Sequence, residues 1–473
     1  MKKFDIKGIW WLPERKDNKL NGILHYIEDK EYTLELFGKF EGSQHKYKHS
    51  VINGCSVNGV GYTLCDCLYT NIVTHMPDFP ETTINVSIIF ENIIVEKFDD
   101  IRLNAASFSF SFLDNWVHTN GFASGIGKHK LLDVKNLIIN YCLPDKIENK
   151  IDNDFYLNIN FIVNTPTYTL TQKKMRIKQK TEIEIIPQHD NALSYFIEKI
   201  MYFRHFLMLA LNANTKKLYI KIKPVSCDNI KTNNDKPAFI YIKDKAEDFK
   251  KKEISPLDMV FSYPSIKDRL NFMLNTWYKN HTDCYSAYTL YFETLHHKGL
   301  NLENFLLNLT QTLESYHRKK YNSEYMDKEE FKNTIYKKLV ENIPSDLESD
   351  FKESLKSKIR YGYEYFLRRR LKEIFQQNNN FLKKFISDHE TLINEIVETR
   401  NYYTHYDEKS KFVKTYSDLY ELCEKIKVIF ISLLLFDLGF KFEEVQQFIE
   451  YQEMLGRLIN VSKYDFRSKI IKN

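Results

Sequence analysis

The stretch "YSDLYELCEKIKVIFISLLLFDLGF", residues 416–440, decides how the second half of this chain folds. Its apolar residues recur at intervals of three and four, which is the period of a helix face. The run "VIFISLLLF" (428–436) within it stops at Asp437 and has about half the length that a bilayer span needs. The stretch therefore predicts a helix that is buried either in a helical core or in a contact between two copies of the chain.

The same helical period extends from this stretch back to about residue 285. Short polar connections separate the periodic segments, which predicts neighbouring helices packed as a bundle. The helices are expected at 302–321, 328–343, 346–377, 381–400 and 416–440. We therefore expect an all-α domain over residues 285–473.

Residues 1–280 follow a different pattern. Short segments rich in β-branched and aromatic residues alternate with period two and are separated by clusters of Gly, Asn, Asp and Pro. Strands are expected at 21–29, 31–40, 82–90, 155–163, 174–186, 217–224 and 238–244, with one amphipathic helix near 191–213. Trp10 and Trp11 are adjacent, so in a strand they face opposite sides. The predicted fold class is α+β multidomain, with a β-rich antiparallel sandwich or barrel-like N-terminal domain followed by the helical bundle.

Composition narrows the possible functions. The chain has 473 residues, 43% hydrophobic and 28% charged, and its formal net charge of +5 predicts no general affinity for polyanions. No apolar run of signal-peptide length precedes Pro13, so we expect a cytoplasmic protein without membrane contact.

The seven cysteines are scattered, as in proteins of a reducing compartment. "CDC" at 65–67, near Cys55, His49 and His75, lacks the usual zinc spacing, so we favour strand packing and expect no metal or other cofactor.

The stretch "NEIVETRNYYTHYDEK" (394–409) carries the candidate chemistry. Five helical positions place Arg400 and His405 about 140° apart, so a shared face requires the helix to end or bend between them. Imidazole can accept or donate a proton near neutral pH, and a guanidinium can hold a phosphate and stabilise its transition-state charge. Asn401 could bind phosphate or orient the imidazole. These residue types suit RNA cleavage without a metal, and a symmetric dimer would supply the second acid-base group.

A purely structural role for the same residues stays open. Arg400 could pair with Glu398 or Glu408 on a solvated surface, and His405 could simply close a loop. Arg368, Arg369 and Arg370 likewise either grip RNA or form the solvated face of a long helix, and the solvated face is the simpler expectation.

A family resemblance favours the catalytic interpretation. "RNYYTH" in a C-terminal helical bundle resembles the Arg-x4–6-His signature of HEPN ribonucleases, and "LTQTLESYHR" (309–318) resembles the first-helix segment of one branch of that superfamily. "GIWWLPE" (8–14), "NGIL" (21–24) and "LELFGKF" (34–40) resemble the N-terminal domain of the ApeA family, bacterial antiphage proteins that end in a HEPN domain. Together these segments span most of the chain.

The resemblance implies a homodimeric, metal-independent endoribonuclease that acts on RNA in abortive infection. Arg400 and His405 would be the catalytic pair with Asn401 beside them, and the N-terminal domain would sense a phage-derived trigger or restrain the site. Glu314, His317 and Arg318 would contact substrate, although Glu314 and Arg318 could equally form an i,i+4 pair on a polar helix face. Asp407 stands where the HEPN proteins that are paired with a nucleotidyltransferase commonly carry a tyrosine, so regulation through that position is in doubt. The alternative is an inactive HEPN bundle that only binds RNA or a protein.

Overall fold

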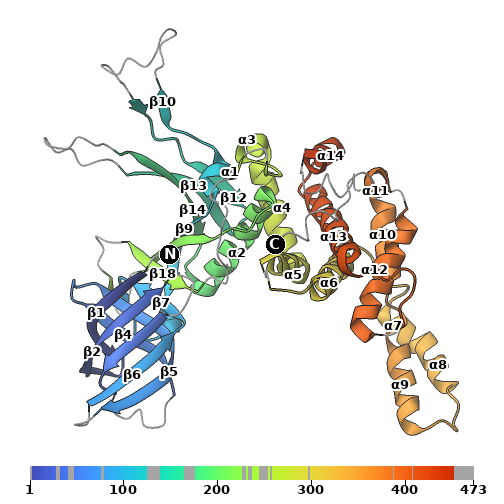
Figure 1. Cartoon of the computed structure of the whole chain (residues 1–473), viewed down its shortest axis with the longest axis horizontal. Helices are drawn as coiled ribbons and strands as arrows, with labels where there is room; N and C mark the ends of the chain where they lie inside the picture. The colour runs from blue at the N-terminus through green and yellow to red at the C-terminus, as the bar shows by residue number, and fades with distance from the viewer. Residues whose placement is uncertain are drawn as a thin grey trace. The chain divides into compact units, whose positions relative to one another are not determined.

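The computed structural model describes residues 3–27, 32–40, 47–75, 79–124, 139–164, 176–225, 231–232, 237–243, 254–255, 258–296, 299–386, 388–406 and 408–451. The chain divides into two compact units, Met1–Tyr278 and Lys279–Asn473. The first is rich in antiparallel strands and the second is helical (Figure 1). The predicted fold class is therefore confirmed.

The N-terminal strands close into an antiparallel barrel (Figure 1). They pair in the order β5 (Gly61–His75), β4 (Lys48–Ser56), β1 (Lys3–Leu12), β2 (Arg15–Ile27), β3 (Tyr32–Phe37) and β6 (Phe79–Val86). A further pairing between β5 and β6 completes the ring. The "CDC" group lies on β5, as its interpretation as strand packing predicted.

Alternating side chains of these strands fill the barrel. Tyr32, Leu34 and Leu36 of β3 point inward and are buried, and the ring of Trp10 packs among them. A Cβ atom at Gly54 would lie 2.1 Å from that ring, so only glycine fits there. Trp11 is half-buried, and Lys19 Nζ lies 5.6 Å from its ring centre. The two adjacent tryptophans therefore do face opposite sides.

A second part of the sheet continues from β5 beyond the barrel. It runs through β7 (Ile88–Glu91), β18 (Ala238–Ile242), β16 (Lys217–Pro224), β9 (Arg102–Phe110), β14 (Lys178–Pro187), β13 (Phe155–Asn164) and β12 (Ile147–Ile151), with β15 (Asn191–Ala192) beside β9. Helix α2 (Leu193–Leu211) packs on one face, where Phe203 contacts Phe108 with ring centres 5.7 Å apart. The predicted helix near 191–213 is thus present, and it covers the extended sheet.

Short elements complete the first unit. They are β8 (Ile93–Ile94), which pairs with β17 (Lys231–Thr232), β10 (Phe122–Ser124), which pairs with β11 (Ile139–Tyr141), η1 (Phe98–Asp100), α1 (Leu113–Val117), α3 (Tyr263–Ile266) and η3 (Lys267–Arg269). Helix α4 (Leu270–Asp283) crosses the division between the units and was not expected from the sequence.

The second unit is built around α6 (Leu302–Lys320) and α13 (Tyr416–Asp437). The other helices are α5 (Tyr285–His296), α7 (Lys328–Phe331), a π-helical turn (Lys332–Tyr336), α8 (Lys337–Glu341), α9 (Ser349–Arg360), α10 (Leu367–Gln377), α11 (Asn379–Phe385), α12 (His389–His405) and α14 (Phe442–Tyr451). Helix α6 packs against α5, α10, α12 and α13. Residues 428–435 of α13 are all buried inside this one chain, so its apolar run forms core and needs no second copy to cover it.

Two helix predictions were wrong in detail. The single helix expected over 346–377 is interrupted at Tyr361–Phe366, because Glu364 forms a β-bridge with Glu324 and Tyr363 is buried against Phe331. The helix expected over 381–400 is divided into α11 and α12, and α12 continues to His405. Within the part of the chain that the structure describes, no helix is long and apolar enough to cross a membrane.

Candidate active site

Helix α12 carries the candidate triad in its last two turns. The helix starts at an N-cap, where the Asp388 side chain accepts from the Thr391 backbone N–H. It ends where Tyr406 takes a left-handed backbone conformation (φ 56°) and its N–H bonds to the Tyr402 carbonyl at 2.6 Å. The predicted helix end is therefore real, but it lies at His405 and not between Arg400 and His405.

This geometry separates the two charged side chains. Because Arg400 and His405 both belong to one continuous helix, they point about 140° apart and are offset by about 7.5 Å along the axis. Arg400 is half-buried, whereas Asn401 and His405 are exposed. A single α12 thus presents the guanidinium and the imidazole on different faces.

The loop after α12 returns along the helix and is fixed to it. Thr399, which is fully buried, accepts from the Lys414 backbone N–H at 3.0 Å. The Lys414 ammonium pairs with Glu395 at 2.7 Å, and the Tyr403 hydroxyl donates to the Lys414 carbonyl at 3.3 Å. These contacts hold the helix end in place from the side opposite its exposed residues.

The surroundings of Arg400 decide one of the open alternatives. Glu398 pairs with Arg368 at 2.9 Å, and none of the carboxylates that the structure describes pairs with Arg400. Arg400 Nη1 donates to the Asn401 side-chain oxygen at 3.2 Å, which leaves further guanidinium donors unused. A surface ion pair with Glu398 or Glu408 therefore does not account for Arg400.

Half-buried and exposed aromatic rings lie at the helix end together with a lysine. The rings of Tyr402, Tyr403 and Tyr406 lie with centres 5.1–6.2 Å apart, and Lys409 Nζ lies 5.2 Å from the Tyr402 ring centre. Tyr406 is 69% exposed and Tyr416 is 87% exposed. Asp407 lies outside the described residues. Exposed rings next to cations are groups on which nucleic-acid bases can stack.

The second predicted group forms a buried network on α6. Arg318 bridges Glu314 (3.4 Å) and Glu364 (3.2 Å), so the i,i+4 pair considered from the sequence is present. His317 is fully buried, and its Nε2 lies 3.0 Å from Glu373. Burial lowers the pKa of His317, the positive charge of Arg370 lowers it further, and the hydrogen bond to Glu373 opposes both effects.

Arg370 is the member of this network that sequence reasoning missed. It was expected on a solvated face, but its side chain is 1% exposed, so that prediction was wrong. Arg370 Nε donates to the Tyr365 carbonyl at 2.8 Å, Nη1 lies 3.4 Å from His317 Nδ1, and Nη2 lies 3.7 Å from Glu364. Its spacing of four from Ile374, on the apolar face of α10, is a signal that could have shown it to be buried.

The structure does not bring the two predicted groups together. Glu303, in the first turn of α6, is close enough to Tyr403 to raise the pKa of that hydroxyl, after burial as the larger cause. His317 lies on the order of 20 Å further along the α6 axis. Glu314, His317 and Arg318 therefore stand apart from the end of α12, and His317 and Arg370 are enclosed by protein.

Comparison with known families explains both halves of the chain. The family model "ApeA N-terminal domain 1" matches residues 5–277, more than half of the sequence, and "Apea-like HEPN" matches residues 307–444. The chain belongs to the ApeA family. No curated protein and no solved structure gives a significant match to it.

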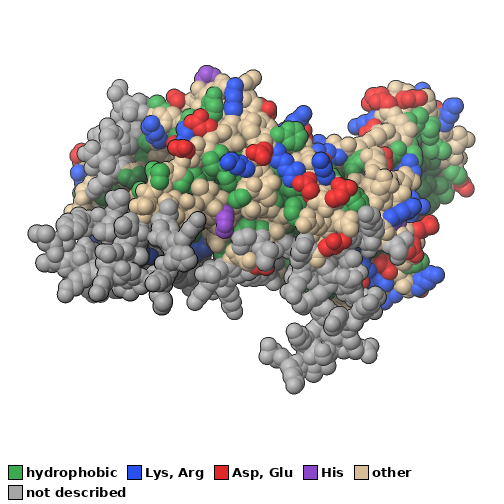
Figure 2. All heavy atoms as spheres, turned by 90° about the horizontal axis from the view of Figure 1, so that it is seen from above, with side chains coloured by type: hydrophobic (Ala, Val, Ile, Leu, Met, Phe, Trp, Pro, Cys, Tyr) green, Lys and Arg blue, Asp and Glu red, His purple; other side chains and the backbone are tan. Residues whose placement is uncertain are grey.

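Both groups of predicted site residues lie within the HEPN match of this ApeA protein. Glu314, His317 and Arg318 fall near its start, and Arg400, Asn401 and His405 fall in its last third. On the face shown in Figure 2, Lys and Arg are interspersed with Asp and Glu. No group of three or more His, Cys, Asp or Glu residues in the described ranges is arranged to hold a metal ion. Burial raises the pKa of Cys65 to about 12, which fits a thiol buried by strand packing on β5.

Proposed function

We propose that this ApeA protein is an antiphage endoribonuclease whose HEPN unit cleaves RNA with Arg400 and His405. The observation that carries the proposal is the state of Arg400. Arg318, Arg368 and Arg370 of the same unit all pair with carboxylates, whereas the half-buried guanidinium of Arg400 pairs with none of the carboxylates that the structure describes. Such a guanidinium and an exposed imidazole, brought together across two copies of the chain, are suited to receive a phosphodiester.

The chemistry follows from these two groups. His405 takes the proton from a ribose 2′-hydroxyl, whose oxygen then attacks the adjacent phosphorus. Arg400 and the Asn401 amide stabilise the added charge on the phosphate oxygens. A second imidazole protonates the departing 5′-oxygen, so the products carry a 2′,3′-cyclic phosphate and a 5′-hydroxyl. The reaction needs ribose at the cut and uses protein groups in place of a metal.

The separation of Arg400 and His405 on α12 favours a homodimer as the active form. Two copies related by a two-fold axis could set the His405 of one helix beside the Arg400 of the other. The same arrangement would supply the second imidazole. We infer a composite site at a contact between the C-terminal bundles.

The β-rich unit, residues 1 to about 280, would sense a phage-derived signal or restrain the nuclease. In this scheme, recognition of infection in the cytoplasm releases cleavage of host or phage RNA and stops growth. Glu314, His317 and Arg318 would act mainly by supporting the bundle, since His317 is fully buried and Arg318 is ion-paired.

Cleavage of defined RNA by the purified full chain tests the proposal. Arg400→Ala and His405→Ala should each lower the rate by about 10²–10⁴-fold, the range for loss of acid-base catalysis or of an oxyanion donor. Arg360→Ala is a matched control, because Arg360 is an exposed arginine at the end of α9. Cleavage should persist with chelator and stop on RNA with a 2′-deoxy nucleotide at the cut. Undiminished cleavage by both variants would overturn the assignment of Arg400 and His405 as the catalytic pair, and undiminished toxicity of both would leave only an RNA- or protein-binding role.

Mixing the two inactive variants tests the composite site. In a mixed dimer, one site would combine the intact Arg400 of one chain with the intact His405 of the other. Mixing Arg400→Ala with His405→Ala protein should therefore restore part of the activity, because this site has the base and the guanidinium and lacks only the second imidazole. If each site used both residues from one chain, mixing would restore nothing, and the dimeric arrangement would be wrong.

A further inference from the structure

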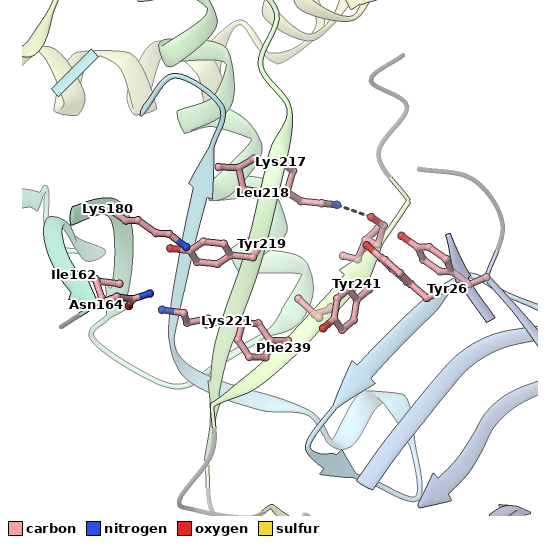
Figure 3. A pocket seen from close by; sticks show the side chains of 13 residues that line it. Tyr26, Ile162, Asn164, Lys180, Lys217, Leu218, Tyr219, Lys221, Phe239 and Tyr241 are labelled. Carbon is pink, nitrogen blue, oxygen red and sulfur yellow. Dashed lines mark hydrogen bonds between the residues drawn. The ribbon is translucent and has the colours of Figure 1, made fainter. Parts of the chain in front are cut away.

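Two of the lysines that line a hollow of about 310 Å³ in the β-rich unit are engaged by the protein itself (Figure 3). Lys217 donates to the Ile242 carbonyl at 2.5 Å, and in Figure 3 its ammonium points away from Lys180. Lys221 pairs with Glu182 at 2.6 Å. Among these lining lysines, only Lys180 is left without a polar contact to a described residue. One such lysine is ordinary surface charge.

The start of α10 presents a cation of a different kind. Arg369 is exposed, and its guanidinium lies 5.4 Å from the ring centre of Tyr365. None of the carboxylates that the structure describes pairs with it, whereas Arg368 and Arg370 on either side are both paired. An arginine that stacks on a ring and keeps its charge uncompensated can hold a base and a neighbouring phosphate together.

A second tyrosine extends this surface. The Tyr325 ring lies edge-on to the Tyr365 ring with centres 4.6 Å apart, and Tyr325 is 59% exposed. Backbone hydrogen bonds fix both residues: the Tyr325 N–H donates to the Tyr363 carbonyl at 2.7 Å, and the Tyr365 N–H donates to the Ser323 carbonyl at 2.8 Å. We call Tyr325, Tyr365 and Arg369 the α10 platform.

The platform forms where the helix predicted over 346–377 is interrupted. The interruption at Tyr361–Phe366 includes the β-bridge between Glu324 and Glu364, which brings the two tyrosines together. The Glu364 carboxylate lies 3.2 Å from Arg318, so it is engaged away from the platform arginine. Places where a chain departs from its own local preference are often functional sites.

The platform lies next to the face of α12 that carries two of the proposed catalytic residues. Arg368, the residue before the platform arginine, donates to Asn394 and Glu398 of α12. Asn401 and His405 continue the same helix face, at intervals of three and four from Glu398. His405 lies about 10 Å beyond Glu398 along the helix axis. A strand of a few nucleotides can therefore reach from the platform to the imidazole.

We propose that the α10 platform binds the nucleobases of an unpaired RNA strand and positions that strand for the cut. Bases of a duplex are stacked on each other, whereas the splayed bases of a single strand can stack on tyrosine rings and on an arginine plane. The Arg369 charge attracts the adjacent phosphates. The choice of RNA as ligand rests on the proposed nuclease; the platform adds its substrate class and the residues that hold the strand.

Binding of a short, uncleavable 2′-O-methyl oligonucleotide to the full chain tests the platform by fluorescence anisotropy. The single strand should bind at least about tenfold more tightly than the same strand annealed to its complement. Tyr325→Ala should weaken this binding by about 5- to 150-fold, the range for one base–aromatic stack, and Tyr325→Phe should not. Arg369→Met should weaken it more than Arg369→Lys, which keeps the charge and loses the stacking plane. Phe351→Ala is the control, because it removes a ring of similar exposure, 51%, from α9 and should leave the affinity unchanged.

Cleavage separates the platform from the proposed nuclease. On unpaired RNA, Tyr325→Ala should raise KM by the same factor and leave kcat within about twofold, because the ring does not touch the reacting atoms. Equal affinity for single strand and duplex, or unchanged binding by Tyr325→Ala and Arg369→Met, would overturn the platform even where His405→Ala abolishes cleavage. Platform-dependent binding by a chain that does not cleave would support the platform and overturn only the nuclease. Loss of self-association in Tyr325→Ala with unchanged RNA binding would make this surface a protein contact instead.

Discussion

The two units of this ApeA protein build their interiors in different ways. The core of the barrel is formed mainly by apolar and aromatic side chains, such as Trp10, Leu34 and Ile84, and the buried polar groups of its strands, such as Thr82, are uncharged. The helical unit buries charged groups among its helices, including Arg370 at 1% exposure and Glu424 at 3%. Arg370 is held by His317 and nearby carboxylates, and Glu424 pairs with Lys427 at 2.8 Å.

The difference shows how each architecture satisfies its polar groups. Strand pairing around a closed ring satisfies the backbone, so the barrel side chains can remain apolar. Helices satisfy their own backbones, and between the helices of this unit Arg370 and Glu424 are enclosed together with their partners. A buried charge costs free energy unless its partners are all in place. We therefore expect the barrel to respond to lost volume and the helical unit to lost partners.

The largest expected effect is in the barrel. Trp10→Ala should lower the free energy of unfolding of the β-rich unit by about 3–5 kcal/mol, because it removes the largest buried side chain of the barrel core. Trp11→Ala should cost roughly 1 kcal/mol, since that ring is only half-buried. Denaturant unfolding can be followed by tryptophan fluorescence, because the four tryptophans all lie before residue 279. An equal loss of unfolding free energy in the two variants would contradict the assignment of Trp10 to the inside and Trp11 to the outside of the barrel.

In the helical unit, the adjacent residues Arg369 and Arg370 provide the test that Trp10 and Trp11 provide in the barrel. Arg370→Met should destabilise this unit by about 3 kcal/mol, because His317 and the Tyr365 carbonyl lose a buried partner. Arg369→Met should cost less than about 1 kcal/mol, since Arg369 is exposed and only lies 5.4 Å from the Tyr365 ring centre. Far-UV circular dichroism reports mainly on the helices. A neutral Arg370→Met variant would show that the buried network contributes little.

Acid should weaken the helical unit through His317. Its pKa in the folded chain is lowered from 6.5, first by burial and then by Arg370. Below about pH 6.5 the unfolded chain therefore binds a proton that the folded chain does not. The free energy of unfolding of the helical unit thus decreases as the pH is lowered. The slope is at most about 1.4 kcal/mol per pH unit. His317→Gln should flatten this dependence in circular dichroism melts and leave the fluorescence transition of the β-rich unit unchanged.

The smallest expected effect has the opposite sign and belongs to the barrel. Burial lowers the pKa of His25, but Asp5 at 2.8 Å and Glu35 at 3.2 Å together raise it above 6.5. The stability from this contact is fully present below pH 6.5 and is lost as pH rises through the raised pKa. His25→Gln should remove that decline in fluorescence-monitored unfolding, and salt should weaken it. An unchanged pH profile would show that these exposed carboxylates contribute nothing measurable.

The sequence by itself determined much of this architecture. Period-two alternation predicted β3, β13, β14 and β16, and the three-and-four period predicted α6 and α13 and part of α12. Both patterns are local, because they follow from how one element presents its faces. The family resemblance was equally readable and is confirmed by the family matches. The catalytic roles of Arg400, Asn401 and His405 stay predictions that only the proposed variants can test.

Tertiary structure decided what depends on partners distant in the chain. Closure of the barrel requires β5 to pair with β6, and no local period encodes that contact. In the sequence, Arg370 is one of three consecutive arginines that nothing local distinguishes. It is buried because α10 packs against α6, which brings His317 to its guanidinium. Arg368 of α10 forms an ion pair with Glu398 of α12, so Glu398 does not pair with Arg400. Charge and burial are set by neighbours in space, and a linear pattern does not contain those neighbours.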